Sequence, residues 1–298
     1  MTVIQGENLT KSYGKILALD HLTFQIEENK LTGLIGRNGA GKTTLLKIIA
    51  GYLQPTQGEI KVFFQNPFNS LQVSANIIFI DNHMMFPPAF RLKDILSEVS
   101  RFYNNWDKKL AQRLFDYFSF NPKQRHSSLS KGNQSTFNMI IGLAAHCPLT
   151  IFDEPTSGMD SAVRKDFYRA LLKDYLEYPR TIILSSHLLS EVEDILEDIL
   201  LLREGTRCLH QSVLDLKEYA LGLKGPKQRV IEGLEGKEIL YSEEFAQGSL
   251  YAVIKNQGLT SQEFVKQEDL ELLPVPLEDL CIYLTGNTKG GIDHVFKQ

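Results

Sequence analysis

The sequence predicts an α/β fold in which a parallel β-sheet is covered by helices, with smaller regions before and after it. Three observations support this prediction. Residues 31–35, 76–80 and 149–152 are short apolar runs of the kind found in strands buried on both faces. A glycine-rich turn after the first run leads directly into a helical pattern of apolar residues. Strands and helices then alternate through the middle of the chain, which indicates a parallel sheet with helices on both sides.

Composition limits the classes of protein that the chain can represent. Its 298 residues are 43% hydrophobic and 23% charged, which is typical of soluble globular proteins and allows one large domain and a smaller one. With 32 basic and 36 acidic residues the net charge is −4, which argues against nucleic acid as a partner. No apolar run reaches the roughly 18 residues of a membrane span, and the N-terminal residues lack a secretory signal. We therefore expect a cytoplasmic chain that reaches a membrane only through a partner.

The first 26 residues are predicted to form short strands and turns. Leu22, Phe24 and Ile26 alternate with polar residues, as in a half-buried strand. Tyr13 is expected in a turn over residues 11–14. A second turn at residues 57–59 is expected to lead into a short strand at 60–64.

The glycine-rich turn after residue 35 carries the first chemical signal. Gly36, Gly41, Lys42 and Thr43 satisfy the G-x-x-x-x-G-K-[ST] pattern of a phosphate-binding loop. Glycines let successive backbone N–H groups point at one phosphate, and the following helix presents its positive end to the same anion. Lys42 would reach the β- and γ-phosphates, and the Thr43 hydroxyl would ligate Mg²⁺. A turn that matches the pattern by chance is the alternative, which the strand before it and the helix after it disfavour.

Beyond this loop the predicted elements follow in order. Residues 83 to about 146 have a helical pattern, and one face of a helix after Asp107 carries four apolar residues, Leu110, Leu114, Phe115 and Phe118. After the strand at 149–152 comes a helix with apolar residues at four-residue intervals, Val163, Phe167, Leu171 and Tyr175. A strand at 181–186 and a helix around 188–195 complete the alternation.

A change of character after about residue 212 predicts a small α+β appendage. Gly and Pro turns separate β-like runs at 228–231 and 250–254, and a helix near 277–284 precedes a polar tail at 287–298.

Polar residues follow two of the predicted buried strands. Asp153 and Glu154 come directly after the strand at 149–152, where Asp153 can hold Mg²⁺ through water and Glu154 can polarise an attacking water. Acid pairs at strand ends are common, so this signal alone is weak. Ser130 and Gly132 stand before a helical run, either as an anion-binding helix start or as a plain N-cap. His187 ends the strand at 181–186, where it could contact phosphate or be structural.

In this order and spacing, over residues 3–212, these motifs resemble the ATP-binding subunit of ABC transporters. The resemblance makes Glu154 the catalytic glutamate, His187 the switch histidine and Asp160 part of the D-loop at 157–160. Tyr13 matches the aromatic residue that stacks on adenine. The phosphate loop that would bind ATP comprises Gly36, Arg37, Asn38, Gly39, Ala40, Gly41, Lys42, Thr43 and Thr44. The signature motif, which would act on the ATP of another chain, comprises Ser130, Lys131, Gly132 and Asn133.

The resemblance implies a fold and a mechanism. The fold is a P-loop NTPase core of the ABC ATPase type over residues 1–212, with an N-terminal antiparallel β subdomain and a helical subdomain at 83–146. Residues 213–298 would form a C-terminal accessory domain. Two ATPase subunits, identical or paralogous, would pair head to tail around two ATP molecules with Mg²⁺, and hydrolysis would drive export by integral membrane permease subunits. These would dock on the part of the helical region from residue 83 to about 120, with the loop at 86–90 either as receiver or as ordinary core packing.

Three residues depart from the family pattern. Asn82 stands where a glutamine normally contacts Mg²⁺ and the attacking water, and its shorter amide would need a water bridge. Lys131 replaces the first signature glycine, and Asn133 replaces a glutamine or methionine. These changes keep open a nucleotide-gated regulatory subunit that hydrolyses ATP slowly.

Overall, the chain most resembles the ABC-2-type branch of bacterial exporter ATPases, which serve drug, antibiotic-peptide, polysaccharide or acetoin-linked systems. A DNA-repair or chromosome-structure ATPase is disfavoured because residues 48–150 contain no sustained heptads for a coiled coil. A translation-factor variant is disfavoured because it would need two phosphate loops.

Overall fold

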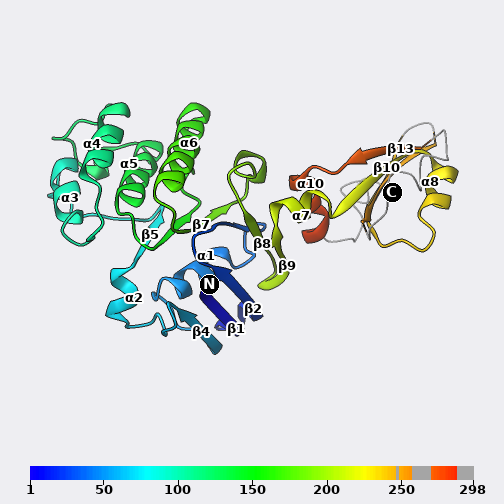
Figure 1. Cartoon of the computed structure of the whole chain (residues 1–298), viewed down its shortest axis with the longest axis horizontal. Coiled ribbons are helices and arrows are strands. Elements are labelled where there is room, and N and C mark those ends of the chain that lie inside the picture. The colour runs from blue at the N-terminus through cyan, green and yellow to red at the C-terminus, as the bar shows by residue number, and fades with distance from the viewer. Residues whose placement is uncertain (246–247, 257–269, 287–298) are drawn as a thin grey trace. The chain divides into compact units, whose positions relative to one another are not determined.

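The computed structural model describes residues 1–245, 248–256 and 270–286, and the chain divides into two units, Met1–His210 and Gln211–Gln298 (Figure 1). This division lies close to the boundary expected at residue 212. The accessory role of the second unit stays a prediction. Each unit has its own sheet, so we describe them separately.

A six-stranded sheet forms the centre of the first unit. Its strands lie in the order β5 (Ile77–Asp81), β6 (Leu149–Asp153), β7 (Thr181–Ser186), β3 (Leu31–Ile35), β8 (Asp198–Arg203) and β9 (Thr206–Ser212). The pairings of β5 with β6, β6 with β7, and β3 with both β7 and β8 are parallel. All residues of β3, β6 and β7 are buried, which confirms the interpretation of the apolar runs. In a parallel sheet the carboxyl ends of these strands meet at one edge, and the phosphate-loop turn leaves from that edge.

Two elements after β7 differ from the prediction. The helix expected around 188–195 is only a single 3₁₀ turn, η2 (Leu189–Glu191), and the strand β8 that follows it was not anticipated. The apolar residues of 188–195 have a helical spacing, but the segment forms only this single turn, and the backbone of the strand β8 that follows pairs in parallel with β3.

An antiparallel sheet contains the N-terminal residues. Its strands lie in the order β2 (Ile16–Glu27), β1 (Thr2–Tyr13) and β4 (Gln57–Val62). Leu22, Phe24 and Ile26 are almost completely buried, which confirms the alternating strand pattern. The expected turns are wrong in two places, because Tyr13 ends β1 and residues 57–59 already pair with it. Bulges in β1 let one long strand pair on both sides where the sequence indicated breaks.

Helix α1 (Lys42–Ile49) joins the two sheets. Leu45, Leu46, Ile48 and Ile49 are buried in one hydrophobic cluster that also contains residues of β1 to β8. Because the helix is buried on both sides, its N-terminal end is held firmly at the edge of the parallel sheet. The short helix α2 (Leu71–Ala75) precedes β5.

The expected helical region contains α3 (Leu92–Val99), α4 (Lys108–Tyr117), the 3₁₀ turn η1 (His126–Ser128) and α5 (Lys131–Ala144). Asp107 is the N-cap of α4, where its carboxylate accepts a 2.8 Å bond from the Leu110 N–H. Helix α6 (Ser161–Glu177) follows β6, with Phe167 and Leu171 buried as the four-residue spacing indicated.

The second unit is an α+β fold, as expected. Its antiparallel sheet has the order β11 (Ile239–Phe245), β12 (Ser249–Lys255), β10 (Ala220–Pro226) and β13 (Glu271–Pro274). The helices are α7 (Val213–Lys217), α8 (Lys227–Gly233) and α10 (Leu277–Thr285). The β-like run expected at 228–231 is wrong, because it lies in α8 and buries Val230 against Leu223 and Ile254. The polar tail at 287–298 lies outside the described residues.

Candidate active site at the carboxyl edge of the parallel sheet

The phosphate-binding loop connects β3 to the first turn of α1. Gly41 is the N-cap of α1 with φ of 99°, a left-handed conformation that suits glycine. A Cβ atom there would lie 2.5 Å from the Ala18 carbonyl oxygen, so glycine is required on steric grounds as well. No side chain caps this helix, which leaves its first N–H groups available to an anion. Thr43 is exposed in the same turn, so its hydroxyl is accessible.

Lys42 is buried inside this loop. Its side chain is 5% exposed, and Nζ donates to the Gly36 carbonyl oxygen at 2.7 Å and to that of Arg37 at 3.4 Å. The Glu154 Oε1 atom lies 3.5 Å from the same nitrogen. A buried ammonium needs such partners, and they hold it at the centre of the loop.

The carboxyl ends of β6 and β7 bring three further candidates together. Ser185 Oγ donates to Asp153 Oδ1 at 2.6 Å and accepts from the Glu154 N–H at 2.9 Å. Glu154 has φ of 47° and points its carboxylate between Lys42 and His187, whose Nδ1 lies 3.5 Å from Glu154 Oε2. The structure therefore places the expected base beside both the phosphate-loop lysine and the strand-end histidine.

Asn82 follows β5 and also reaches Glu154. Its Nδ2 donates to the Glu154 carbonyl oxygen at 2.9 Å, and its Oδ1 accepts from Ser135 Oγ at 3.1 Å. Asn82 thus contacts the backbone of the candidate base. Ser135, in α5, is a contact residue that sequence reasoning missed, because nothing in the local pattern distinguishes it from other helical serines.

The candidate signature residues lie at the start of α5. Ser130 is the N-cap of α5, and its hydroxyl oxygen accepts a 3.3 Å hydrogen bond from the Asn133 N–H. In the single chain Ser130 therefore acts as a plain N-cap. Ser130, Lys131 and Asn133 are exposed. Gly132 packs against the D-loop, since a Cβ on it would lie 2.4 Å from the Gly158 carbonyl oxygen.

Two other candidates lie at the borders of the site. Asp160 is the N-cap of α6 and accepts bonds of 3.0 and 2.9 Å from the N–H groups of Ala162 and Val163. Tyr13 is 47% exposed at the end of β1, with Lys11 Nζ 5.4 Å from the centre of its ring. An exposed ring of this kind has a free face for a base to stack on.

The proline-rich loop before α3 is partly used for packing. Phe86 meets the rings of His126 and Phe137 edge-on, with ring centroids 5.0 and 6.3 Å apart. Burial lowers the pKa of His126, although the Asn138 side chain 2.9 Å from Nε2 acts against this shift. Met85 in the same loop is 89% exposed. Phe86 is therefore part of a core cluster, and Met85 leaves an apolar surface beside it.

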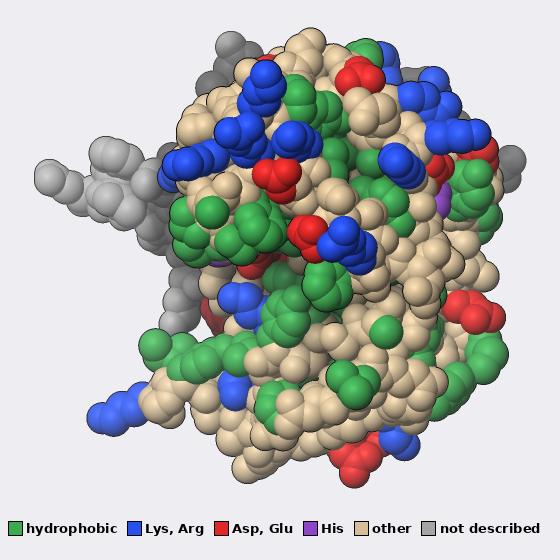
Figure 2. All heavy atoms as spheres, turned by 90° about the vertical axis from the view of Figure 1, so that its left-hand side faces the viewer, with side chains coloured by type: hydrophobic (Ala, Val, Ile, Leu, Met, Phe, Trp, Pro, Cys, Tyr) green, Lys and Arg blue, Asp and Glu red, His purple; other side chains and the backbone are tan. Residues whose placement is uncertain are grey.

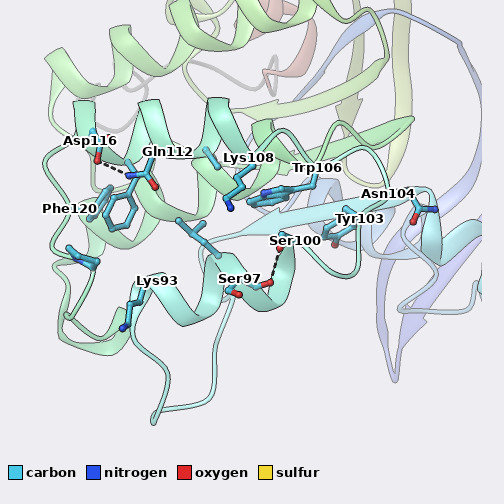
Figure 3. A pocket seen from close by; sticks show the side chains of 14 residues that line it. Lys93, Ser97, Ser100, Tyr103, Asn104, Trp106, Lys108, Gln112, Asp116 and Phe120 are labelled. Atoms are coloured by element: carbon cyan, nitrogen blue, oxygen red, sulfur yellow. Dashed lines mark hydrogen bonds between the residues drawn. The ribbon is translucent and has the colours of Figure 1, made fainter.

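A cavity of about 510 Å³ lies between α3 and α4 (Figure 3). In Figure 3, helix α3 with Lys93 and Ser97 lies opposite helix α4 with Lys108 and Gln112. Trp106 and Phe120 lie towards its two ends. The lining is about equally polar and apolar, with aromatic rings beside two lysines and one carboxylate, Asp116. Among the described residues no helix is both long and apolar enough to cross a bilayer.

The residues at the sheet edge fit a bound Mg²⁺ ion. Mg²⁺ prefers oxygen ligands and usually keeps several waters, taking one or two carboxylates together with substrate phosphates. Thr43 offers a hydroxyl and Asp153 a carboxylate at this edge. Among the described residues there is no group of three or more His, Cys, Asp or Glu side chains that could hold a metal ion.

Comparisons with known proteins give a consistent result. Residues 19–157 match the family model described as ABC transporter. An uncharacterized ABC transporter ATP-binding protein of Methanocaldococcus jannaschii is 30% identical over 217 residues, which are 72% of this chain and 79% of that protein. The bacitracin transport ATP-binding protein of Bacillus licheniformis is 29% identical over 207 residues, 68% of each chain.

Solved structures share the fold. An ATP-binding subunit of an ABC transporter aligns with a TM-score of 0.64 at 21% identity, covering 78% of this chain and 95% of that one. A dimeric ATP-binding cassette bound to ADP and Pi aligns with a TM-score of 0.62 at 22% identity, covering 70% and 98%. At these identities the likeness concerns the fold.

Proposed function

Because this chain belongs to the family of ABC transporter ATP-binding proteins, we propose that it is the ATP-hydrolysing subunit that powers a membrane exporter. The chain is an ABC ATPase, and ATP is its substrate. The observation that carries the proposal is the position of Glu154, between Lys42 of the phosphate loop and His187. A carboxylate in this place can orient and polarise the water that attacks the γ-phosphate.

Each residue at the sheet edge has a proposed task. Lys42 and the N–H groups at the start of α1 bind the β- and γ-phosphates, and His187 contacts the γ-phosphate. Thr43 and, through water, Asp153 hold Mg²⁺, which neutralises the charge that develops on the phosphate oxygens. Tyr13 stacks on the adenine ring. Asn82 and Glu154 complete the group around the attacking water.

A second ATPase subunit would complete the site. In a single chain Ser130, Lys131 and Asn133 are exposed at the start of a 14-residue helix. A helix N-terminus placed against a γ-phosphate makes charge-assisted contacts that ADP cannot offer. We therefore expect ATP to join two subunits head to tail and hydrolysis to release them.

The membrane partner would dock on the helical region. Figure 2 shows this side of the molecule, where Lys and Arg side chains gather on the upper part and hydrophobic side chains are grouped among them. The cavity between α3 and α4 and the exposed Met85 support an amphipathic cytoplasmic segment of a permease as the occupant. Such a partner would hold this chain at the inner face of the membrane. The bacitracin transport relative supports a role in transport, and export is the direction that we propose.

Size-exclusion chromatography of Glu154→Gln tests the proposal. This variant keeps the shape of the side chain but loses the base, so ATP binds without being hydrolysed and the dimer accumulates. Lys42→Ala removes phosphate binding and is the matched control that stays monomeric with ATP. A Glu154→Gln chain that remained monomeric at saturating ATP would contradict the paired site. A wild-type chain without measurable hydrolysis would favour a regulatory role instead.

A further inference from the structure

We propose that Ser135 is a positioning residue for ATP hydrolysis. It contacts the side chain of Asn82, which in turn holds the backbone of Glu154. The inference rests on the proposed ATPase function and adds a residue to it. Ser135 is buried in α5, and its Oγ lies 3.1 Å from Asn82 Oδ1 and 3.0 Å from the Ser157 carbonyl oxygen. Three segments distant in the sequence therefore meet at one hydroxyl group.

The orientation of the Asn82 amide follows from its two partners. The Glu154 carbonyl oxygen can only accept a hydrogen bond, so the amide nitrogen must face it, at 2.9 Å. The amide oxygen then faces Ser135, whose single hydroxyl proton is shared between this oxygen and the Ser157 carbonyl oxygen 3.0 Å away. Removing the hydroxyl would leave this orientation supported on one side only.

Glu154 needs this support because of its backbone. A non-glycine residue with φ of 47° is in a sparsely populated conformation that the surrounding structure must maintain. The N–H of Glu154 is held by Ser185 Oγ, and its carbonyl oxygen accepts both from Asn82 and from the Ser157 N–H at 3.2 Å. The peptide groups on both sides of the candidate base are thus fixed, which fixes where its carboxylate points.

The same hydroxyl connects Glu154 to the signature helix. Ser135 lies one turn after Lys131, and Gly132 packs directly on the D-loop backbone at Gly158. A displacement of the start of α5 would therefore be transmitted to the D-loop and, through Asn82, to Glu154. When the start of α5 contacts a nucleotide, this chain of contacts would set the geometry of the base.

The variant Ser135→Ala distinguishes a positioning role from a purely structural one, which would lower stability and leave kcat unchanged. Asn82 and Ser157 are exposed, so water can replace the lost hydrogen bonds in Ser135→Ala, and the melting temperature should change by no more than about 4 °C. We expect kcat for ATP to fall by about tenfold or more, since a small misplacement of a reacting group is costly. KM for ATP should change little, because the phosphate loop is untouched. Ser128→Ala is the control, because its hydroxyl donates only to Arg125 in an exposed turn.

A double-mutant comparison and amide exchange decide the question in the full-length chain. If Ser135 acts through Asn82, the double variant Asn82→Ala with Ser135→Ala loses no more kcat than Asn82→Ala alone. Hydrogen–deuterium exchange at the Glu154 and Ser157 amides should be faster in both single variants and unchanged in Ser128→Ala. Additive losses of kcat, or unchanged exchange in Ser135→Ala, would overturn the inference. A wild-type chain without hydrolysis would refute the proposed function, whereas the exchange measurement would still decide the Ser135 contact.

Discussion

Replacement of Gly132 by alanine tests the contact between the signature helix and the D-loop. The added Cβ would lie 2.4 Å from the Gly158 carbonyl oxygen, whereas ordinary contacts begin at 3.4 Å. The obstacle is backbone, so it cannot turn aside like the end of a flexible side chain. One of the two segments must therefore move by about 1 Å.

The size of the effect follows from that displacement. Overpacking of this kind costs about 1–3 kcal/mol of folding free energy, and alanine in place of glycine in a helix returns up to about 1 kcal/mol. The net loss of stability is thus about 0–3 kcal/mol. A 1 Å shift of a catalytic arrangement can reduce the rate by about 100-fold. We therefore expect a variant that folds but hydrolyses ATP far more slowly.

Steady-state ATP hydrolysis and urea unfolding of the same preparation measure the two effects. Gly233→Ala is the matched control, because its Cβ would lie 3.5 Å from Leu270, an ordinary contact in α8 of the second unit. This control should keep the wild-type rate. A Gly132→Ala chain with wild-type kcat and wild-type stability would show that α5 and the D-loop are not packed as described.

Three further predictions concern buried groups. Arg180→Ala leaves Asp174 without the guanidinium 2.6 Å away and should cost about 3–5 kcal/mol in urea unfolding, whereas Arg101→Ala at an exposed pair should cost less than about 1 kcal/mol. Burial raises the pKa of Cys147 to about 12, so iodoacetamide at pH 8 should leave this thiol unmodified in the native chain and label it after unfolding, as read by mass spectrometry. Burial lowers the pKa of His126 below its ordinary 6.5, so protons bind the unfolded chain preferentially and the free energy of unfolding should fall as the pH drops from 7 towards 5. His126→Gln should show a smaller fall, and an identical fall would contradict this explanation.

The phosphate loop and the strand-end carboxylates could be predicted because their signals are local. Gly41 and Lys42 lie in the turn that follows a buried strand, and the spacing of the glycines indicates the backbone conformations that the loop needs. Asp153 and Glu154 follow another buried strand, and the rule that parallel strands end at one edge places them near the loop. The sequence alone was therefore enough to predict the phosphate loop and the position of the two carboxylates at the carboxyl edge of the parallel sheet.

Other elements were misjudged because the deciding partner is distant in the sequence. Residues 228–231 have a β-like composition, yet they form α8 because Val230 packs on the sheet of the second unit. The strand β8 exists because β3 lies beside it. Local propensity spans about 1 kcal/mol or less per residue, and such tertiary contacts outweigh it.

The sequence by itself determined the kind of chemistry in this protein, because a phosphate loop, a strand-end acid pair and a helix-start serine are each specified by neighbours within a few positions. Only the tertiary structure decided how these parts are connected. Asn82 and Ser135 are 53 residues apart, and the approach of Gly132 to Gly158 joins the start of helix α5 to the D-loop. Such contacts depend on how helix α5 lies against the sheet, and no local pattern of side chains encodes that placement.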